Sequence, residues 1–137
     1  MRTDKPILLL EDDEVDVMTV RRALTDLGIK NELLVAGNGE EGLEVLRDFR
    51  RKRPGIIFLD LNMPRMDGLE FLRVVRSEGL AAGIPVIVLT TSRQDRDVVE
   101  GFQLNVAGYM VKPVDYKQFV GLLRTIDHYW TLSELPN

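Results

Sequence analysis

The chain has 137 residues and a mass of 15.6 kDa, a size that fits one domain with a sizeable buried core. Its net charge of -4 argues against a surface whose main role is nucleic-acid binding, and the absence of cysteine excludes disulfides, thiolate metal sites and cysteine nucleophiles. After Pro6 the amino terminus offers a run of only four apolar residues before Glu11, too few for the apolar region of a signal peptide or for a membrane span, so we expect a cytoplasmic protein without membrane contact.

Five short apolar runs predict β-strands. Four are rich in Ile, Val and Leu and show little alternation with polar residues, which is typical of strands covered on both faces. These runs span residues 7–10, 56–59, 85–89 and 108–111, and a weaker run spans 32–36.

Helices are predicted between the strands, because apolar residues recur there at spacings of three and four. In chain order the marking positions are Val17, Val20, Leu24 and Leu27 before Gly28; Leu43 and Leu46; Leu69, Leu72 and Val75 after Gly68; Val98, Val99 and Phe102 after the capping-box sequence 92–95; and Phe119, Leu122, Leu123 and Ile126. We expect the second helix to end in the basic stretch 50–53, which favours a solvated helix end over a nucleic-acid patch.

Alternating strands and helices predict a doubly wound α/β fold, a five-stranded parallel sheet flanked by five helices. We expect a single domain over 1–137, with an extended last helix and tail over about 115–137. The flavodoxin-like strand order 2-1-3-4-5 follows known precedent and places the first and third strands side by side at the switch point.

Polar residues follow three of the predicted strands. Glu11, Asp12 and Asp13 follow the first strand, Asp60 follows the third and Lys112 follows the fifth. The carboxyl ends of parallel strands meet at one edge of the sheet, so these side chains are expected to converge. Each pair of carboxylates 4 Å apart repels by on the order of 4 kcal/mol at an effective dielectric of 20. Such a cluster either takes up protons or binds a cation.

The available ligands predict a hard cation, and Mg²⁺ fits best, because only oxygen atoms are on offer. We expect Asp12 and Asp60 as direct ligands, with Glu11 or Asp13 acting through water. Taken alone, the acidic run 11–13 could equally be a solvated helix start.

Two further residues predict that the pocket accepts a phosphoryl group. Lys112 offers a positive charge suited to phosphate oxygens, and Thr90 offers a hydroxyl, although a lone threonine more often caps a turn. Asp60 is then the best-placed nucleophile, and an aspartyl phosphate is the expected product.

These motifs resemble the receiver domain of two-component response regulators over nearly the whole chain. The resemblance makes Asp60 the phosphoacceptor, with Glu11 and Asp12 as the acidic pair and the backbone carbonyl of Asn62 completing the metal site. Thr90 becomes the switch hydroxyl, and Lys112 with Pro113 the Lys-Pro signature. Tyr109 resembles the aromatic residue that moves inward when the threonine engages phosphate.

The carboxyl-terminal segment resembles standalone regulators that serve bacterial phytochrome kinases. Its features are Tyr129 and Trp130, followed by Leu135 and Pro136. The two aromatic residues are expected either to pack onto the core or to form the contact of a two-fold homodimer.

We therefore expect a signalling switch rather than an enzyme, one that catalyses only its own phosphoryl transfer and slow autodephosphorylation. A sensor histidine kinase would phosphorylate Asp60 with Mg²⁺ and alter a face that binds an output partner, which the sequence does not name. The alternative is a small phosphohydrolase of the haloacid dehalogenase type. Such enzymes need a general acid two residues after the nucleophile, and Asn62 has no proton to give.

Overall fold

The structure is a computed structural model that describes residues 4–90, 106–111 and 115–133. Its sheet has five parallel strands in the order β2-β1-β3-β4-β5, which confirms the predicted order. The strands are β1 (Ile7–Leu10), β2 (Leu33–Ala36), β3 (Ile56–Asp60), β4 (Val86–Thr90) and β5 (Gly108–Val111). Asp60 and Thr90 are thus the last residues of their strands rather than the first residues of the loops that follow.

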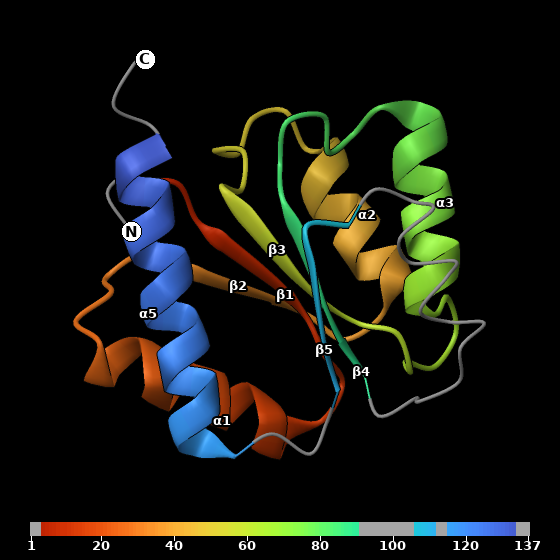
Figure 1. Ribbon diagram of the computed structural model, residues 1–137. Coiled ribbons are helices and arrows are strands. Elements are labelled where there is room, and N and C mark those ends of the chain that lie inside the picture. The colour runs from red at the N-terminus through yellow and green to blue at the C-terminus, as the bar shows by residue number, and fades with distance from the viewer. Residues whose placement is uncertain (1–3, 91–105, 112–114, 134–137) are drawn as a thin grey trace.

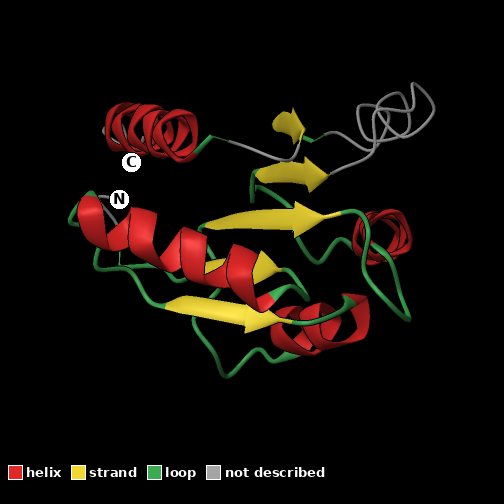
Figure 2. Ribbon diagram, turned by 90° about the horizontal axis from the view of Figure 1, so that it is seen from below, coloured by secondary structure: helices red, strands yellow, loops and turns green. Residues whose placement is uncertain are grey.

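Helices cover both faces of the sheet, as a doubly wound fold requires. Helices α1 (Glu14–Asp26) and α5 (Tyr116–Ser133) lie over one face, and α2 (Gly39–Arg47) and α3 (Gly68–Glu78) lie over the other (Figures 1 and 2). The helix predicted between residues 92 and 105 lies outside the described residues.

The side chains of the central strands alternate between two hydrophobic clusters, one on each face. In β1, Leu8 and Leu10 join the cluster under α2 and α3, while Ile7 and Leu9 join the cluster under α1 and α5. All four are fully buried. This explains why the strand shows no polar alternation in the sequence, since both of its faces are covered.

Each of the first three helices begins at a polar cap. Asp13 accepts hydrogen bonds from the N–H groups of Val15 and Asp16, at 2.8 and 3.2 Å. Asn38 does the same for α2 and Asp67 for α3, each at 2.9 Å. These bonds satisfy N–H groups that have no partner within the first turn of a helix, so the caps fix where each helix starts.

Helix α2 ends at Arg47, so the prediction that it ends in the basic stretch 50–53 is wrong. Asp48 adopts an extended backbone, and its carboxylate accepts a 3.1 Å hydrogen bond from the N–H of Arg50. The Nε atoms of Arg50 and Arg51 also donate to this carboxylate, and the bonds from Arg50 lower the pKa of Asp48. The short side chain of Asp48 thus bonds a backbone N–H that would otherwise take part in the helix, and the helix ends before the basic residues.

None of the helices within the described ranges is both long enough and apolar enough to cross a membrane.

Candidate cation and phosphoryl site

The parallel pairing of β1 with β3 brings two acidic residues to the same level of the sheet. Leu10, the last residue of β1, pairs with Leu59, so the residues that follow them in the chain, Glu11 and Asp60, lie next to each other at the carboxyl edge. This is the switch point, where β1 is flanked by β2 and β3. The pairing of β1 with β3 is therefore sufficient to bring Glu11 and Asp60 together.

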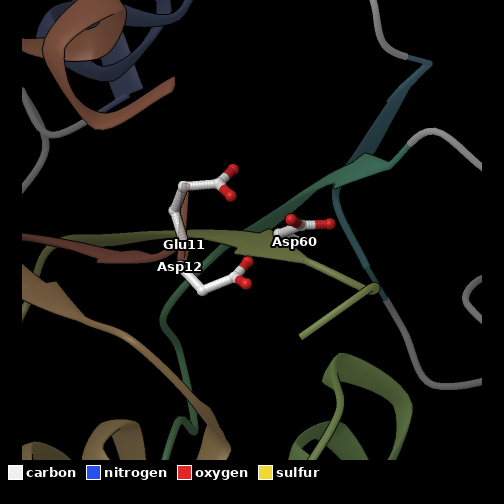
Figure 3. A group of neighbouring side chains, drawn as sticks. All are labelled: Glu11, Asp12 and Asp60. Carbon is white, nitrogen blue, oxygen red and sulfur yellow. The ribbon is translucent and has the colours of Figure 1, made fainter. Parts of the chain in front are cut away.

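Three carboxylates gather at this edge. Oxygen atoms of Glu11, Asp12 and Asp60 lie within 4.8 Å of one another. Figure 3 shows Glu11 and Asp12 extending from the end of β1 and Asp60 from the end of β3. Glu11 is 2% exposed and Asp60 6%, whereas Asp12 is exposed. The cluster thus has two buried members and one that faces solvent.

Asp13 belongs to the helix rather than to this cluster. Its Oδ1 caps α1, and its backbone N–H donates a 3.2 Å hydrogen bond to Oε1 of Glu11. The N–H of Glu11 in turn donates to the carbonyl of Ala36 on β2, at 2.9 Å. Of the two residues expected to act through water, the structure places Glu11 in the cluster and uses Asp13 as a cap.

The loop after β3 orients the carboxylate of Asp60. The backbone N–H of Asn62 donates a 2.9 Å hydrogen bond to Oδ1 of Asp60, and the N–H of Leu61 donates to the carbonyl of Leu89 on β4 at 3.3 Å. Arg65 in the same loop has a φ of 59°, which is uncommon for a residue other than glycine and marks a tight turn. A carboxylate fixed by its own loop is preorganised for a defined direction of attack.

The remaining predicted residues are placed only in part. Thr90 ends β4 and pairs with Val111, the residue that precedes Lys112 in the chain. Lys112 lies outside the described residues, and the structure does not describe the side chain of Thr90. Tyr109 lies on β5, is partly buried and packs against the cluster under α2 and α3. The side chains of Tyr129 and Trp130 are outside the described part of the chain.

Sequence reasoning gave no role to Gly39 and placed Met66 only in the turn into the third helix that resembles the receiver family; in the structure the two residues meet beside the site. The N–H of Gly39 donates a 2.9 Å hydrogen bond to the carbonyl of Met66, so the start of α2 contacts the loop that follows Asp60. The available signal was a glycine directly after each polar cap, Asn38 and Asp67. That pattern indicates a helix start but does not reveal a contact between the two helices' entry loops.

The residues of the cluster fit a divalent cation of the Mg²⁺ type. All the ligand atoms are carboxylate oxygens, and one side of the site is open for waters that such ions retain. Three carboxylates at this separation repel one another by about 3 kcal/mol per pair at an effective dielectric of 20, which a cation would offset. Fold and site together define a flavodoxin-like α/β domain with a cluster of carboxylates, suited to a divalent cation, at the switch point of its sheet.

Many protein families share the flavodoxin-like fold, and comparison with known families shows which of them this chain matches. The model of the response regulator receiver domain matches residues 7–124. The chain belongs to this family. The response regulator Rcp1 of Synechocystis is 33% identical over 130 residues, covering 92% of this chain and 88% of its own length.

Solved structures agree with this assignment. The phosphorylated cyanobacterial phytochrome response regulator RcpA superimposes with a TM-score of 0.81 at 31% identity, covering 93% of this chain and 94% of its own. The Mn²⁺-bound form of Rcp1 gives 0.80, covering 92% and 94%. The bacteriophytochrome response regulator RtBRR gives 0.74 at 42% identity, covering 88% and 76%.

Family membership makes the chain a signalling protein of phosphorelay systems and does not favour the phosphohydrolase alternative. The expected resemblance to receiver domains is confirmed. The structure adds that the acidic residues meet in space, whereas the sequence showed only that they end neighbouring strands.

Proposed function

We propose that Asp60 accepts a phosphoryl group from a sensor histidine kinase, with a cation bound by Asp12, Asp60, the backbone carbonyl of Asn62 and, through water, Glu11. The main support for this proposal is that oxygen atoms of three carboxylates lie within 4.8 Å of one another, and that one of them, on Asp60, belongs to a residue only 6% exposed. Mg²⁺ is the proposed ion because every ligand is an oxygen atom. When bound, it would neutralise charge on the phosphoryl oxygens.

In the transfer, one carboxylate oxygen of Asp60 attacks the phosphorus of a phosphohistidine. An O–P bond forms, the N–P bond breaks, and the histidine ring leaves with the bonding electrons and takes up a proton from solvent. The hydrogen bond from Asn62 to Oδ1 orients the nucleophile. The protein mainly positions groups in such a reaction, so it needs no general acid at position 62.

The product is read out by Thr90, Lys112 and Tyr109 in this proposal. Thr90 and Lys112 would bind the phosphoryl oxygens, and Tyr109 would move further into the core that it already contacts. Two charged hydrogen bonds supply about 3 to 6 kcal/mol together, and shifting an equilibrium from 1:99 to 99:1 needs about 5.5 kcal/mol. Phosphorylation can therefore supply a large part of this free energy, and an output partner that prefers the switched state supplies the remainder.

Incubation with Mg²⁺ and acetyl phosphate tests the central step. We expect the intact mass to rise by one phosphoryl group, and hydroxylamine to remove it, as it does an acyl phosphate. Asp60→Asn should show no adduct, while Asp13→Asn, which keeps the cap and lies outside the cluster, should be modified normally. An unmodified wild-type protein would contradict the proposal.

The proposed kinase is a bacterial phytochrome. Support comes from the similarity of the chain to RcpA and RtBRR, which are phytochrome and bacteriophytochrome response regulators. A purified, autophosphorylated bacterial phytochrome should transfer phosphate to the chain faster than an unrelated histidine kinase does. Equal rates would remove the phytochrome assignment and leave the receiver function intact.

The last helix is the proposed dimer contact, through Tyr129 and Trp130. Helix α5 runs to Ser133, whereas the family match ends at residue 124, so part of the helix extends past the shared domain. Sedimentation of the phosphorylated and unphosphorylated protein, beside Trp130→Ala, tests this. A monomer in both states would end the dimer proposal.

A further inference from the structure

Gly68 packs directly against the backbone that carries Asp60. Its N–H donates a 3.1 Å hydrogen bond to the carbonyl of Leu61. A Cβ atom at Gly68 would lie 2.7 Å from the carbonyl oxygen of Asp60 and 2.7 Å from Cα of Leu61. Real Cβ atoms do not approach other atoms this closely, and both neighbours are backbone atoms. A side chain at position 68 would therefore have to push the end of β3 away.

Gly39 makes the corresponding contact at the other end of the same loop. Besides its hydrogen bond to Met66, a Cβ atom there would lie 2.8 Å from the carbonyl oxygen of Met66 and 2.6 Å from its Cγ. The Met66 side chain could move, but its carbonyl is fixed within the loop. The segment 61–67 thus contacts the first residue of α3 near its start, at Leu61, and the first residue of α2 near its end, at Met66.

The backbone conformation does not require glycine at these positions. The described glycines with positive φ are Gly28, Gly79 and Gly83, whereas Gly39 and Gly68 are the first residues of helices. The first residue of a helix has helical φ and ψ, which residues with a side chain also adopt, so backbone conformation alone does not call for glycine at either position. Space against the loop is what excludes a side chain.

We infer that Gly39 and Gly68 are positioning residues for the cation site. Between them the loop carries Asn62, whose N–H bonds to Asp60, and its position is set by the two close contacts. Displacing the loop by a few tenths of an ångström would misalign Asp60 and the Asn62 carbonyl. The inference rests on the proposed cation site, and it adds two residues that touch neither the cation nor the phosphoryl group.

Binding of Mn²⁺ alone, followed by electron paramagnetic resonance of the free ion, tests the inference. Mn²⁺ accepts the same oxygen ligands as Mg²⁺ and is directly observable. Gly68→Ala and Gly39→Ala should each weaken binding by about tenfold, the lower end of effects seen when residues supporting a metal site are changed. Gly121→Ala is the matched control, since a Cβ atom at Gly121 in α5 meets nothing within 4 Å, and its affinity should equal that of wild type.

A second control separates position from stability. Leu123 is 1% exposed and lies in the cluster under α5, so Leu123→Ala should lower the free energy of unfolding while leaving Mn²⁺ affinity unchanged in folded protein. Adding Met66→Ala to Gly39→Ala should restore part of the affinity, because it removes the Cγ atom at 2.6 Å.

The outcomes are distinct. If wild type binds Mn²⁺ and both glycine variants bind it equally well, the inference is overturned and the proposed function stands. If wild type does not bind Mn²⁺, the proposed cation site fails and the inference fails with it. Should Gly68→Ala not fold, Gly39→Ala decides, since one of its close contacts is a side chain that can move.

Discussion

The backbone N–H of Asp13 donates a hydrogen bond to Oε1 of Glu11, while the carboxylate of Asp13 turns away to cap helix α1. Neighbouring acidic residues thus do different work. Glu11 is buried in the acidic cluster, and Asp13 fixes where the helix begins. Because the two residues have different roles, substitutions in this acidic run can test helix stability and cation binding separately.

Asp13→Ala should lower the free energy of unfolding by about 0.5 to 2 kcal/mol, because two N–H groups lose their cap. Asp13→Asn removes the same charge but keeps a capping oxygen, so it should remain close to wild type. Urea denaturation of both variants measures the difference. Equal losses in the two variants would show that the charge, and not the cap, matters at this position.

Asp12→Asn should raise the free energy of unfolding by about 1 kcal/mol when no divalent cation is present, because it relieves repulsion within the cluster; the gain is smaller than the repulsion of two full carboxylate pairs because solvent screens the exposed Asp12. Wild type should gain about 2.7 kcal/mol when Mg²⁺ is supplied at 100 times its Kd, and the variant should gain much less. Urea denaturation with and without Mg²⁺ provides the measurement. Glu14→Gln loses a charge near the cluster but outside it, so Mg²⁺ should stabilise this control as much as it stabilises wild type. If Mg²⁺ stabilises Asp12→Asn as much as wild type, Asp12 is not a ligand of the ion.

Phe71→Ala and Phe49→Ala should differ sharply in stability. Phe71 belongs to α3 and is fully buried in the cluster under α2 and α3, whereas Phe49 is 83% exposed in the connection after α2. The first change should cost about 3 to 5 kcal/mol and the second less than about 0.5 kcal/mol. Thermal and urea unfolding compare them; a large loss in Phe49→Ala would show that this ring is covered in solution.

Stability should fall at alkaline pH in a way that depends on Tyr116. Partial burial and the hydrogen bond that its hydroxyl donates to Asp26 raise the pKa of Tyr116 above its ordinary value. Since folding favours the protonated phenol, this contribution is complete below the unfolded pKa of about 10 and is lost as pH rises through the folded pKa.

The measurement is the free energy of unfolding of wild type and Tyr116→Phe between about pH 8 and pH 11. Wild type should lose more stability over this range than the variant does. Asp26→Asn should show an intermediate loss, because burial still raises the pKa of Tyr116 after the carboxylate is gone. Parallel curves for all three proteins would contradict the assigned hydrogen bond.

The sheet could be predicted from the sequence because apolar runs such as 7–10 and 56–59 are buried on both faces and leave a strong signal. Asp60 was found for the same reason, since it directly follows such a run. The weaker run at 32–36 corresponds to the edge strand β2, where Val35 is 39% exposed. Edge strands bury less apolar surface and therefore give a fainter pattern.

Other features depend on side-chain direction, which residue spacing does not determine. Asp13 and Glu11 are both acidic and follow the same strand, and only the turn into α1 decides that one caps and the other enters the cluster. The end of α2 was misplaced because Asp48 bonds the following backbone, a local competition that a count of basic residues cannot reveal. The contacts of Gly39 and Gly68 join separate segments and leave no periodic signal.

Strand β3 is paired on both sides, with β1 and with β4, while β2 and β5 form the edges of the sheet. Amide hydrogens of a doubly paired, fully buried strand exchange with solvent only when large parts of the fold open, whereas edge strands open locally at lower cost. The proposed phosphoacceptor is the last residue of that central strand. Chemistry at Asp60 would thus start from the slowest-exchanging part of the protein, and structural change would spread outward toward the edges that open most readily.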